Sequence, residues 1–224
     1  MLHNIKHDFI TLSTKSKLWV VFATLTTLIC SIIAEPDNIL GIIGAISGIL
    51  FVTFVANKKI STYYFGAMFS AIYSYLAFKN KIYGDFLINC FYHLPTQFIG
   101  LMMWKTDRHN EDDVDAESMN AKQIVYTIII DSILICFLSF ILLLIGSVYP
   151  LRDACTNVFS VTAMILMMNR YKEQWVFWIL VNGISVYMWL SVALSTGNGY
   201  ATLIQWCVFF INSLYGYLNW NSKK

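Results

Sequence analysis

Long apolar runs separated by short polar segments follow one another along nearly the whole chain. The runs are continuous rather than alternating, which predicts helices and excludes strands with one polar face. About 20 apolar residues are needed to cross the hydrocarbon core of a bilayer, and most of the runs approach that length. The pattern therefore predicts about eight transmembrane helices, over residues 18–34, 39–56, 62–78, 86–104, 124–148, 154–168, 175–194 and 200–218.

Two of these runs need comment. The sixth is short, and its helix is expected to begin near Asp153. The first follows Lys15 and Lys17, as the apolar part of a secretory signal would. Its apolar stretch is long for a signal, and no A-x-A cleavage site comes after it, so we expect a retained membrane helix.

Composition supports a membrane protein. The chain has 224 residues, of which 58% are hydrophobic and 12% charged, whereas soluble domains contain about 25% charged residues. A net charge of +2 gives no reason to expect nucleic-acid binding. The five cysteines fall in or at the ends of apolar runs without a CxxC pair, so we expect packing residues rather than disulfides or a zinc site.

The positive charges predict the orientation of the chain in the membrane. With eight spans, twelve of the 15 Lys and Arg residues fall on the side that holds both termini, and three fall on the other. Cytoplasmic loops carry an excess of Lys and Arg. Both termini are therefore predicted to be cytoplasmic, in the inner membrane of a bacterial cell.

An internal repeat relates the second to fourth spans to the sixth to eighth. Asn57-Lys58 and Asn169-Arg170 end equivalent spans at an offset of 112 residues, and Gly100-x-x-x-Trp104 and Gly216-x-x-x-Trp220 do so at 116. Three spans are an odd number, so two consecutive triplets would cross the membrane in opposite directions. The fifth span, between them, gives the second triplet the same orientation as the first. The prediction is an all-α membrane protein with a 3+1+3 parallel-repeat core and an extra N-terminal helix. Its parts are an N-terminal segment with that helix (1–37), a first repeat (38–104), a loop and linker helix (105–149), a second repeat (150–220) and a C-terminal tail (221–224). In a transporter built this way, the substrate binds near the midplane between the repeats.

The one sizeable polar segment, residues 105–122, is rich in carboxylates. It lacks the central Gly and terminal Glu of a calcium-binding loop. We therefore expect a solvated cytoplasmic linker.

Trp175, Trp178 and Asn182 occupy positions i, i+3 and i+7 of the seventh span and so share one helix face. At 1.5 Å per residue, Asn182 lies roughly 10 Å deeper than Trp175. An amide at that depth needs a partner, which is either another helix or a ligand. Two indoles leading to an amide suit a flat ring with a polar edge, and the alternative is an interfacial aromatic belt with helix packing.

Other spans also carry uncharged polar side chains to membrane depth. In the fourth span they surround Pro95, which is expected to kink the helix. The residues are Asn89, Tyr92, His93, Thr96 and Gln97 in the fourth span, Thr156, Asn157 and Ser160 in the sixth, and Gln205, Asn212, Tyr215 and Asn219 in the eighth. Such groups join helices or bind a substrate, and their concentration in the repeat spans favours a site.

The residues needed for catalysis or metal binding are not clustered. His93 is the one histidine inside a span, so no metal site is expected. No acid, base and nucleophile come together as an enzyme would require, and no cofactor is expected. Asp131 is the one acid well inside a span, and intramembrane acids are often functional. Ion coupling at Asp131 is the alternative to local helix packing.

Several motifs together resemble the PnuC family of vitamin transporters. They are the stretch from Leu151 to Asn182 with its WxxWxxxN element, Asn89-x-x-Tyr92-x-x-x-x-Gln97-x-x-Gly100-x-x-x-Trp104, and Asn212-x-x-Tyr215-Gly216-x-x-x-Trp220. They cover most of residues 40–220.

The resemblance implies a 3+1+3 core like that of the SWEET sugar transporters, often in trimers. It implies facilitated diffusion of nicotinamide riboside, followed by phosphorylation inside the cell. By motif position, the substrate would contact Trp175, Trp178, Asn182, Asn89, Gln97, Asn212 and Tyr215, with Tyr92 and Thr96 beside them. Thiamine, riboflavin or deoxynucleosides are alternative cargoes, and a non-transporting structural membrane protein is the alternative from another class.

Overall fold

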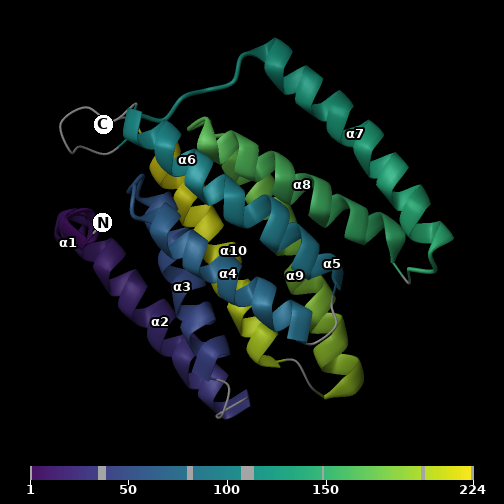
Figure 1. The fold of residues 1–224 in the computed structure, drawn as a ribbon, viewed down its shortest axis with the longest axis horizontal. Coiled ribbons are helices and arrows are strands. Elements are labelled where there is room, and N and C mark those ends of the chain that lie inside the picture. The colour runs from purple at the N-terminus through teal and green to yellow at the C-terminus, as the bar shows by residue number, and fades with distance from the viewer. Residues whose placement is uncertain are drawn as a thin grey trace. The chain divides into compact units, whose positions relative to one another are not determined.

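The computed structural model describes residues 2–34, 39–79, 83–106, 114–147, 149–197 and 200–222, and these are helical nearly throughout. Contacts divide the chain into two compact units, Met1–Asp115 and Ala116–Lys224. The helices, shown in Figure 1, are α1 (Leu2–Thr11), α2 (Thr14–Ala34), α3 (Ile39–Ala56), α4 (Thr62–Lys79), α5 (Tyr83–Ile88), the π-helical stretch η1 (Asn89–His93), α6 (Leu94–Thr106), α7 (Ala121–Leu144), α8 (Pro150–Met168), α9 (Gln174–Thr196) and α10 (Tyr200–Asn221).

The predicted all-α membrane fold is confirmed, and most predicted spans lie on one helix each. The fourth instead covers the end of α5, η1 and α6, and the fifth runs past the end of α7 at Leu144 to Val148, which lies outside the described residues. Helix α3 matches its predicted span residue for residue. Helix α8 begins at Pro150 rather than near Asp153, because proline is well suited to the first position of a helix. Within the described residues, four helices are long and apolar enough to cross a membrane by themselves: α2, α3, α7 and α9. The helices that fall short of that measure include α6 and α10, which carry candidate site residues.

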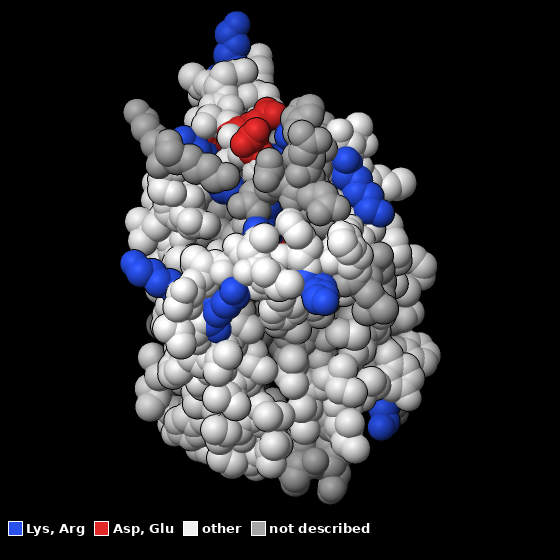
Figure 2. Space-filling model, turned by 90° about the vertical axis from the view of Figure 1, so that its left-hand side faces the viewer, with Lys and Arg blue, Asp and Glu red and all other residues white. Residues whose placement is uncertain are grey.

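The outer surfaces of these helices are apolar. Large hydrophobic side chains are exposed along α2 and α7, including Ile33, Phe137 and Leu144. Figure 2 shows one face of the molecule, where scattered Lys and Arg side chains leave broad uncharged areas between them. Apolar surface on this scale is stable in contact with lipid rather than water. The chain is a multi-pass membrane protein.

In the first unit, α2 packs on α3, α3 on α4, and α4 on α6 (Figure 1). Helix α1 was not predicted, because residues 2–11 are too few and too polar for a span. It packs through Phe9, whose ring centroid lies 4.8 Å from that of Phe54 and 6.4 Å from that of Phe65. These rings, with Leu12 and Val20, form an apolar core between α1 and the transmembrane helices.

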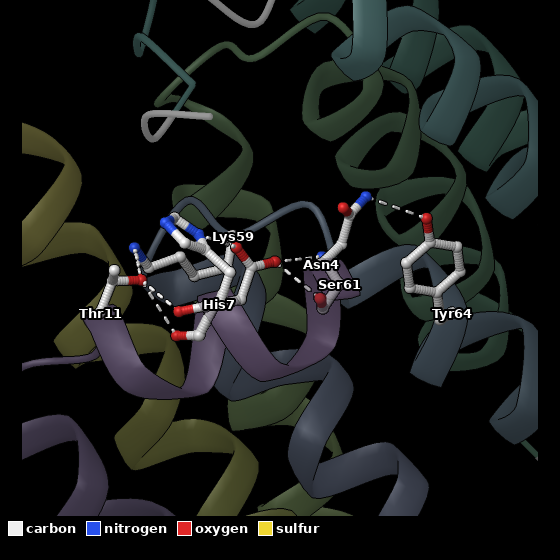
Figure 3. Close-up of polar contacts among 7 residues, drawn as sticks. Asn4, His7, Thr11, Lys59, Ser61 and Tyr64 are labelled. Carbon is white, nitrogen blue, oxygen red and sulfur yellow. Dashed lines mark hydrogen bonds and ion pairs between the residues drawn. The ribbon is translucent and has the colours of Figure 1, made fainter. Parts of the chain in front are cut away.

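Polar contacts attach α1 to the turn between α3 and α4 (Figure 3). One carboxylate oxygen of Asp8 accepts hydrogen bonds from the backbone N–H of Ser61 at 2.9 Å and from its hydroxyl at 2.6 Å. Lys59 donates to the Thr11 hydroxyl at 2.8 Å. Asp8 is 1% exposed. It therefore acts as a buried acceptor for the start of α4, where helix N–H groups lack partners within the helix.

The irregularity expected at Pro95 takes the form of a π-helical turn. Within η1 the backbone N–H of Leu94 bonds the carbonyl of Asn89, five residues earlier. This wider turn lies directly before Pro95, which has no N–H to donate. Single π turns inside helices are frequent at functional sites.

In the second unit, α7 packs on α8, α8 on α9, and α9 on α10. Helix α7 begins with a capping box: Asn120 accepts from the Gln123 backbone at 2.9 Å, and the Gln123 side chain accepts from the Asn120 backbone at 2.8 Å. Asp131 is the buried residue of this helix, and the hydroxyl of Thr162 on α8 donates to it at 2.8 Å. That bond joins α7 to α8.

The turns after α3 and α8 have the same geometry at an offset of 112 residues. Lys58 and Arg170 are both left-handed, with φ angles of 59° and 61°. In each turn, the N–H of the next residue bonds a carbonyl five residues back: Lys59 to Phe54, and Tyr171 to Leu166, both at 2.9 Å. This is a Schellman motif, and a non-glycine residue in its left-handed position costs about 1–2 kcal/mol. The finer repeat boundaries remain a prediction.

Part of the acidic linker pairs with these turns. In the first unit the Val114 N–H bonds the Lys58 carbonyl at 3.4 Å. In the second, Glu117 exchanges backbone hydrogen bonds of 2.9 Å with Arg170 and Lys172, and its carboxylate pairs with the Arg170 guanidinium at 2.8 Å. The described part of this linker is therefore held by hydrogen bonds to the turns after α3 and α8. Asp107, Glu111, Asp112 and Asp113 lie outside the described residues.

Candidate functional site

The predicted residues of the first unit lie on η1 and α6. Asn89 is buried and opens the π turn, and Tyr92 is half-buried with its ring beside that of His93. Thr96 is buried, and its hydroxyl donates to the His93 carbonyl at 2.8 Å. Thr96 therefore has a local partner for its hydrogen. Its role in this structure is to hold the junction between η1 and α6.

Gln97 lies against the backbone of α4. A Cβ atom built on Gly66 would meet the Gln97 amide oxygen Oε1 first and would lie 2.7 Å from the side-chain carbon Cδ, so the amide, with its oxygen toward α4, occupies the space that another residue would fill. Gln97 is 2% exposed, and its oxygen Oε1 has no hydrogen-bond partner among the described residues. A buried amide oxygen without a donor is uncommon and costly.

In the second unit, Asn182 bridges α9 to α10. Its amide nitrogen donates to the Phe209 carbonyl at 3.2 Å and to the Ser213 hydroxyl at 3.3 Å. The buried Asn212 and the half-buried Tyr215 lie on α10 near these two acceptors in sequence. Asn182 therefore bonds to the segment of α10 that carries Asn212 and Tyr215.

Trp175 is 2% exposed because its indole covers Gly216 of α10. A Cβ on Gly216 would lie 2.5 Å from the indole carbon Cζ3. The ring also meets that of Trp220 edge-on, with centroids 6.1 Å apart. Its Nε1 has no acceptor among the described residues. Trp178, one turn along α9, is half-buried and so presents more of its ring than Trp175 does.

The first unit contains a related arrangement that the sequence analysis missed. Tyr63, at an offset of 112 from Trp175, covers Gly100 of α6, with the ring carbon Cζ 2.6 Å from a Cβ built there. Its ring meets that of Trp104 at 5.0 Å between centroids, again edge-on. The repeat offset was the signal that would have found Tyr63. In each unit, an aromatic ring on one helix therefore packs directly on a glycine of the neighbouring helix.

Gln174 was also missed. It is 0% exposed, and both polar atoms of its amide lack hydrogen-bond partners among the described residues. Its position beside Trp175 would have suggested it. Among all the residues that the structure describes, no group of three or more His, Cys, Asp or Glu residues is placed where it could hold a metal ion. The candidate residues are amides, hydroxyls and aromatic rings without formal charge, and they can form hydrogen bonds and stack on a ring.

Comparisons with known proteins agree with this description. A family model described as "Nicotinamide mononucleotide transporter" matches residues 38–222. Similar curated proteins are named "Nicotinamide riboside transporter PnuC". The one from Haemophilus influenzae is 35% identical over 191 residues, covering 84% of this chain and 81% of that protein. The one from Neisseria mucosa is 32% identical over 196 residues, covering 83% and 73%.

The fold agrees as well. A solved structure titled "Crystal structure of the Vitamin B3 transporter PnuC" superposes with a TM-score of 0.79 at 29% identity, covering 93% of this chain and 91% of that one. The resemblance inferred from the motifs is therefore confirmed. The chain belongs to the PnuC family of membrane transporters, which the matching family model describes as nicotinamide mononucleotide transporters.

Proposed function

We propose that this chain carries nicotinamide riboside into the cell by facilitated diffusion. The observation that carries the proposal is the α9 face on which the half-buried Trp178 lies one turn from Asn182. Relatives at 32% and 35% identity are named nicotinamide riboside transporters, which supports the same cargo here.

The chemistry of the cargo matches these side chains. Its pyridinium ring is positively charged, and an indole face attracts a cation. Its carboxamide both donates and accepts hydrogen bonds, as Asn and Gln side chains do. Its ribose hydroxyls match amide, Thr and Tyr side chains. The proposed contacts are Trp175, Trp178, Asn182, Asn212 and Tyr215 in the second unit, and Asn89, Tyr92, Thr96 and Gln97 in the first.

The riboside is favoured over the mononucleotide. A phosphate group is bound in proteins by Arg, Lys or helix N-termini. None of the nine proposed residues is cationic. A phosphorylated product would therefore fit poorly, and we propose that phosphorylation inside the cell traps the riboside and drives net uptake.

The test uses purified protein in liposomes without a kinase. Uptake of nicotinamide riboside should stop when the inner and outer concentrations match, with the membrane potential held at zero. Imposed proton or sodium gradients should leave that endpoint unchanged. Accumulation above equality would refute uniport, and binding of thiamine, riboflavin or thymidine in place of the riboside would refute the cargo.

We further propose that the protein resides in a bacterial inner membrane with both termini cytoplasmic. The twelve-to-three division of Lys and Arg residues supports this. An impermeant thiol reagent applied from outside should label a cysteine engineered at Asn198 and should not label one at Glu117. The reverse pattern would overturn the orientation.

Members of the family often form trimers, and we propose a homotrimer here. The mass of the complex in detergent, corrected for bound detergent, should equal three chains of 25.7 kDa. A monomer mass at concentrations that support transport would refute it.

A further inference from the structure

Helix α1 lies along the turn that joins α3 to α4 (Figure 3). Hydrogen bonds connect the two segments in antiparallel order: Asn4 with Tyr64, Asp8 with Ser61, and Thr11 with Lys59. Helix α2 begins three residues after α1 ends, and both α2 and α3 are long and apolar enough to cross a membrane. A helix that lies along the end of one such span and leads directly into another lies at the membrane surface.

The face of α1 turned away from these contacts is both basic and apolar. It carries His3, Lys6 and Ile10, which occupy positions i, i+3 and i+7 and so share one side of the helix. All three side chains are exposed, and Ile10 is 62% exposed. Cations beside an exposed aliphatic side chain are typical of a helix that lies in the interface between lipid headgroups and acyl chains.

The start of α2 continues this surface. Leu18, Phe22, Leu25 and Ile29 are each more than half exposed and lie on one face of α2, which is therefore the face in contact with lipid. Lys15 is exposed on the same face, one turn before Leu18. A lysine at the end of a lipid-facing stripe extends its ammonium group to the level of the headgroups.

The positive charge of this region is not neutralised by its own acid. Residues 1–34 contain three lysines, and Asp8 is the one acidic residue among them. Asp8 is 1% exposed and bonds Ser61, so it does not reach the outer surface. Within the described residues, neither Lys6 nor Lys15 forms a hydrogen bond or an ion pair. Their ammonium groups can therefore bind an anion.

We propose that His3, Lys6 and Ile10 of α1, together with Lys15 of α2, bind the headgroups of anionic phospholipids. We call these four residues the N-terminal basic surface. Anionic lipids attract basic segments that lie beside a membrane helix. A free phosphate would match the two lysines alone, whereas a lipid also matches Ile10 and the apolar face of α2. The inference extends the proposed orientation, which places this surface in the cytoplasmic leaflet.

The test measures the melting temperature of the purified full-length protein in detergent micelles. The micelles contain increasing amounts of dimyristoylphosphatidylglycerol, or of dimyristoylphosphatidylcholine as the zwitterionic lipid with the same chains. A lipid that binds the folded state raises the melting temperature by mass action. Phosphatidylglycerol should do so at lower mole fractions than phosphatidylcholine. Salt at about 1 M, where the Debye length is about 3 Å, should largely remove the difference.

Variants of the surface test the assigned residues. Each lysine near an anionic surface strengthens binding roughly fivefold, so Lys6→Gln/Lys15→Gln should weaken the apparent affinity for phosphatidylglycerol on the order of 10-fold or more. Its melting temperature in phosphatidylcholine should match wild type. Ile10→Ser keeps the charge and should also weaken the affinity, since it removes the apolar contact. The matched control is Lys79→Gln/Lys105→Gln, which removes two exposed lysines elsewhere in the first unit and should respond as wild type does.

Each possible result decides a separate point. If both lipids stabilise wild type equally, or if the control loses as much affinity as Lys6→Gln/Lys15→Gln, the N-terminal basic surface is refuted. If inorganic phosphate reproduces the effect of phosphatidylglycerol, the ligand is a free anion and the lipid is refuted. If the lipid response is as expected but thiol labelling shows the reverse orientation, the surface stands and its assignment to the cytoplasmic leaflet is wrong. The lipid response does not depend on the cargo, so it is independent of the transport test.

Discussion

Replacing Asp8 with alanine should strongly destabilise the first unit. Asp8 accepts two hydrogen bonds from Ser61 through one oxygen, at 2.9 Å from the backbone nitrogen and at 2.6 Å from the hydroxyl. Ser61 is fully buried, so its donors would lose their acceptor without a direct replacement from water. Hydrogen bonds to charged groups contribute about 1.5–3 kcal/mol each. The two together predict a loss of about 3–6 kcal/mol.

The assay is thermal unfolding of the purified protein in detergent. For chains of this length, 1 kcal/mol corresponds to roughly 2–4 °C, so the melting temperature should fall by roughly 6–24 °C. Asp8→Asn should fall between Asp8→Ala and wild type, because an amide oxygen can accept the same bonds without the charge. Asp115→Ala, which removes an exposed carboxylate of the same unit, is the control and should shift stability by no more than about 0.5 kcal/mol.

A cycle with Ser61→Ala tests the assigned partner. Because that substitution already removes the hydroxyl donor, Asp8→Ala should cost less in the Ser61→Ala background than in wild type. Equal costs in both backgrounds would show that Asp8 does not act through the Ser61 hydroxyl. If Asp8→Ala and Asp115→Ala melt together, α1 does not stabilise the start of α4 and the reasoning is wrong.

Three further predictions follow from the second unit. Gly216→Ala should destabilise by about 1–3 kcal/mol through overpacking against the buried indole, whereas Gly183→Ala should be neutral or stabilising in the same melting assay. Equal effects of the two would contradict the observed packing. Trp178→Ala should weaken binding of nicotinamide riboside by about 1–3 kcal/mol, the range known for base–aromatic stacking. Trp19→Ala on α2 is the control and should have little effect. The reverse result would show that the binding site is not at Trp178. Asp131→Asn should leave the uptake endpoint in liposomes unchanged, since it keeps an acceptor for the Thr162 hydroxyl, and an altered endpoint would point to ion coupling.

The sequence determined where the long apolar helices lie along the chain. The requirement for a continuous apolar run is local and set by the thickness of the bilayer, so α3 was predicted residue for residue and α10 from its first residue. The motifs also identified the family. The short helix α1 could not be predicted from the local apolar pattern, because its stability comes from contacts with distant residues. Phe9 packs on Phe54, and Asp8 bonds Ser61, 53 residues away.

The same division applies to the candidate site. Helical periodicity placed Trp175, Trp178 and Asn182 on one face, since a period of 3.6 residues is a property of the chain alone. Only the tertiary structure showed that the Trp175 ring covers Gly216, and that the Gln97 amide lies on Gly66. Gly100 and Gly216 belong to the repeat motif in the sequence, but a glycine carries no apolar or polar signal that predicts which side chain packs against it. Its importance lies in the side chain that approaches it, and which side chain does so is decided by the packing of helices far apart in sequence.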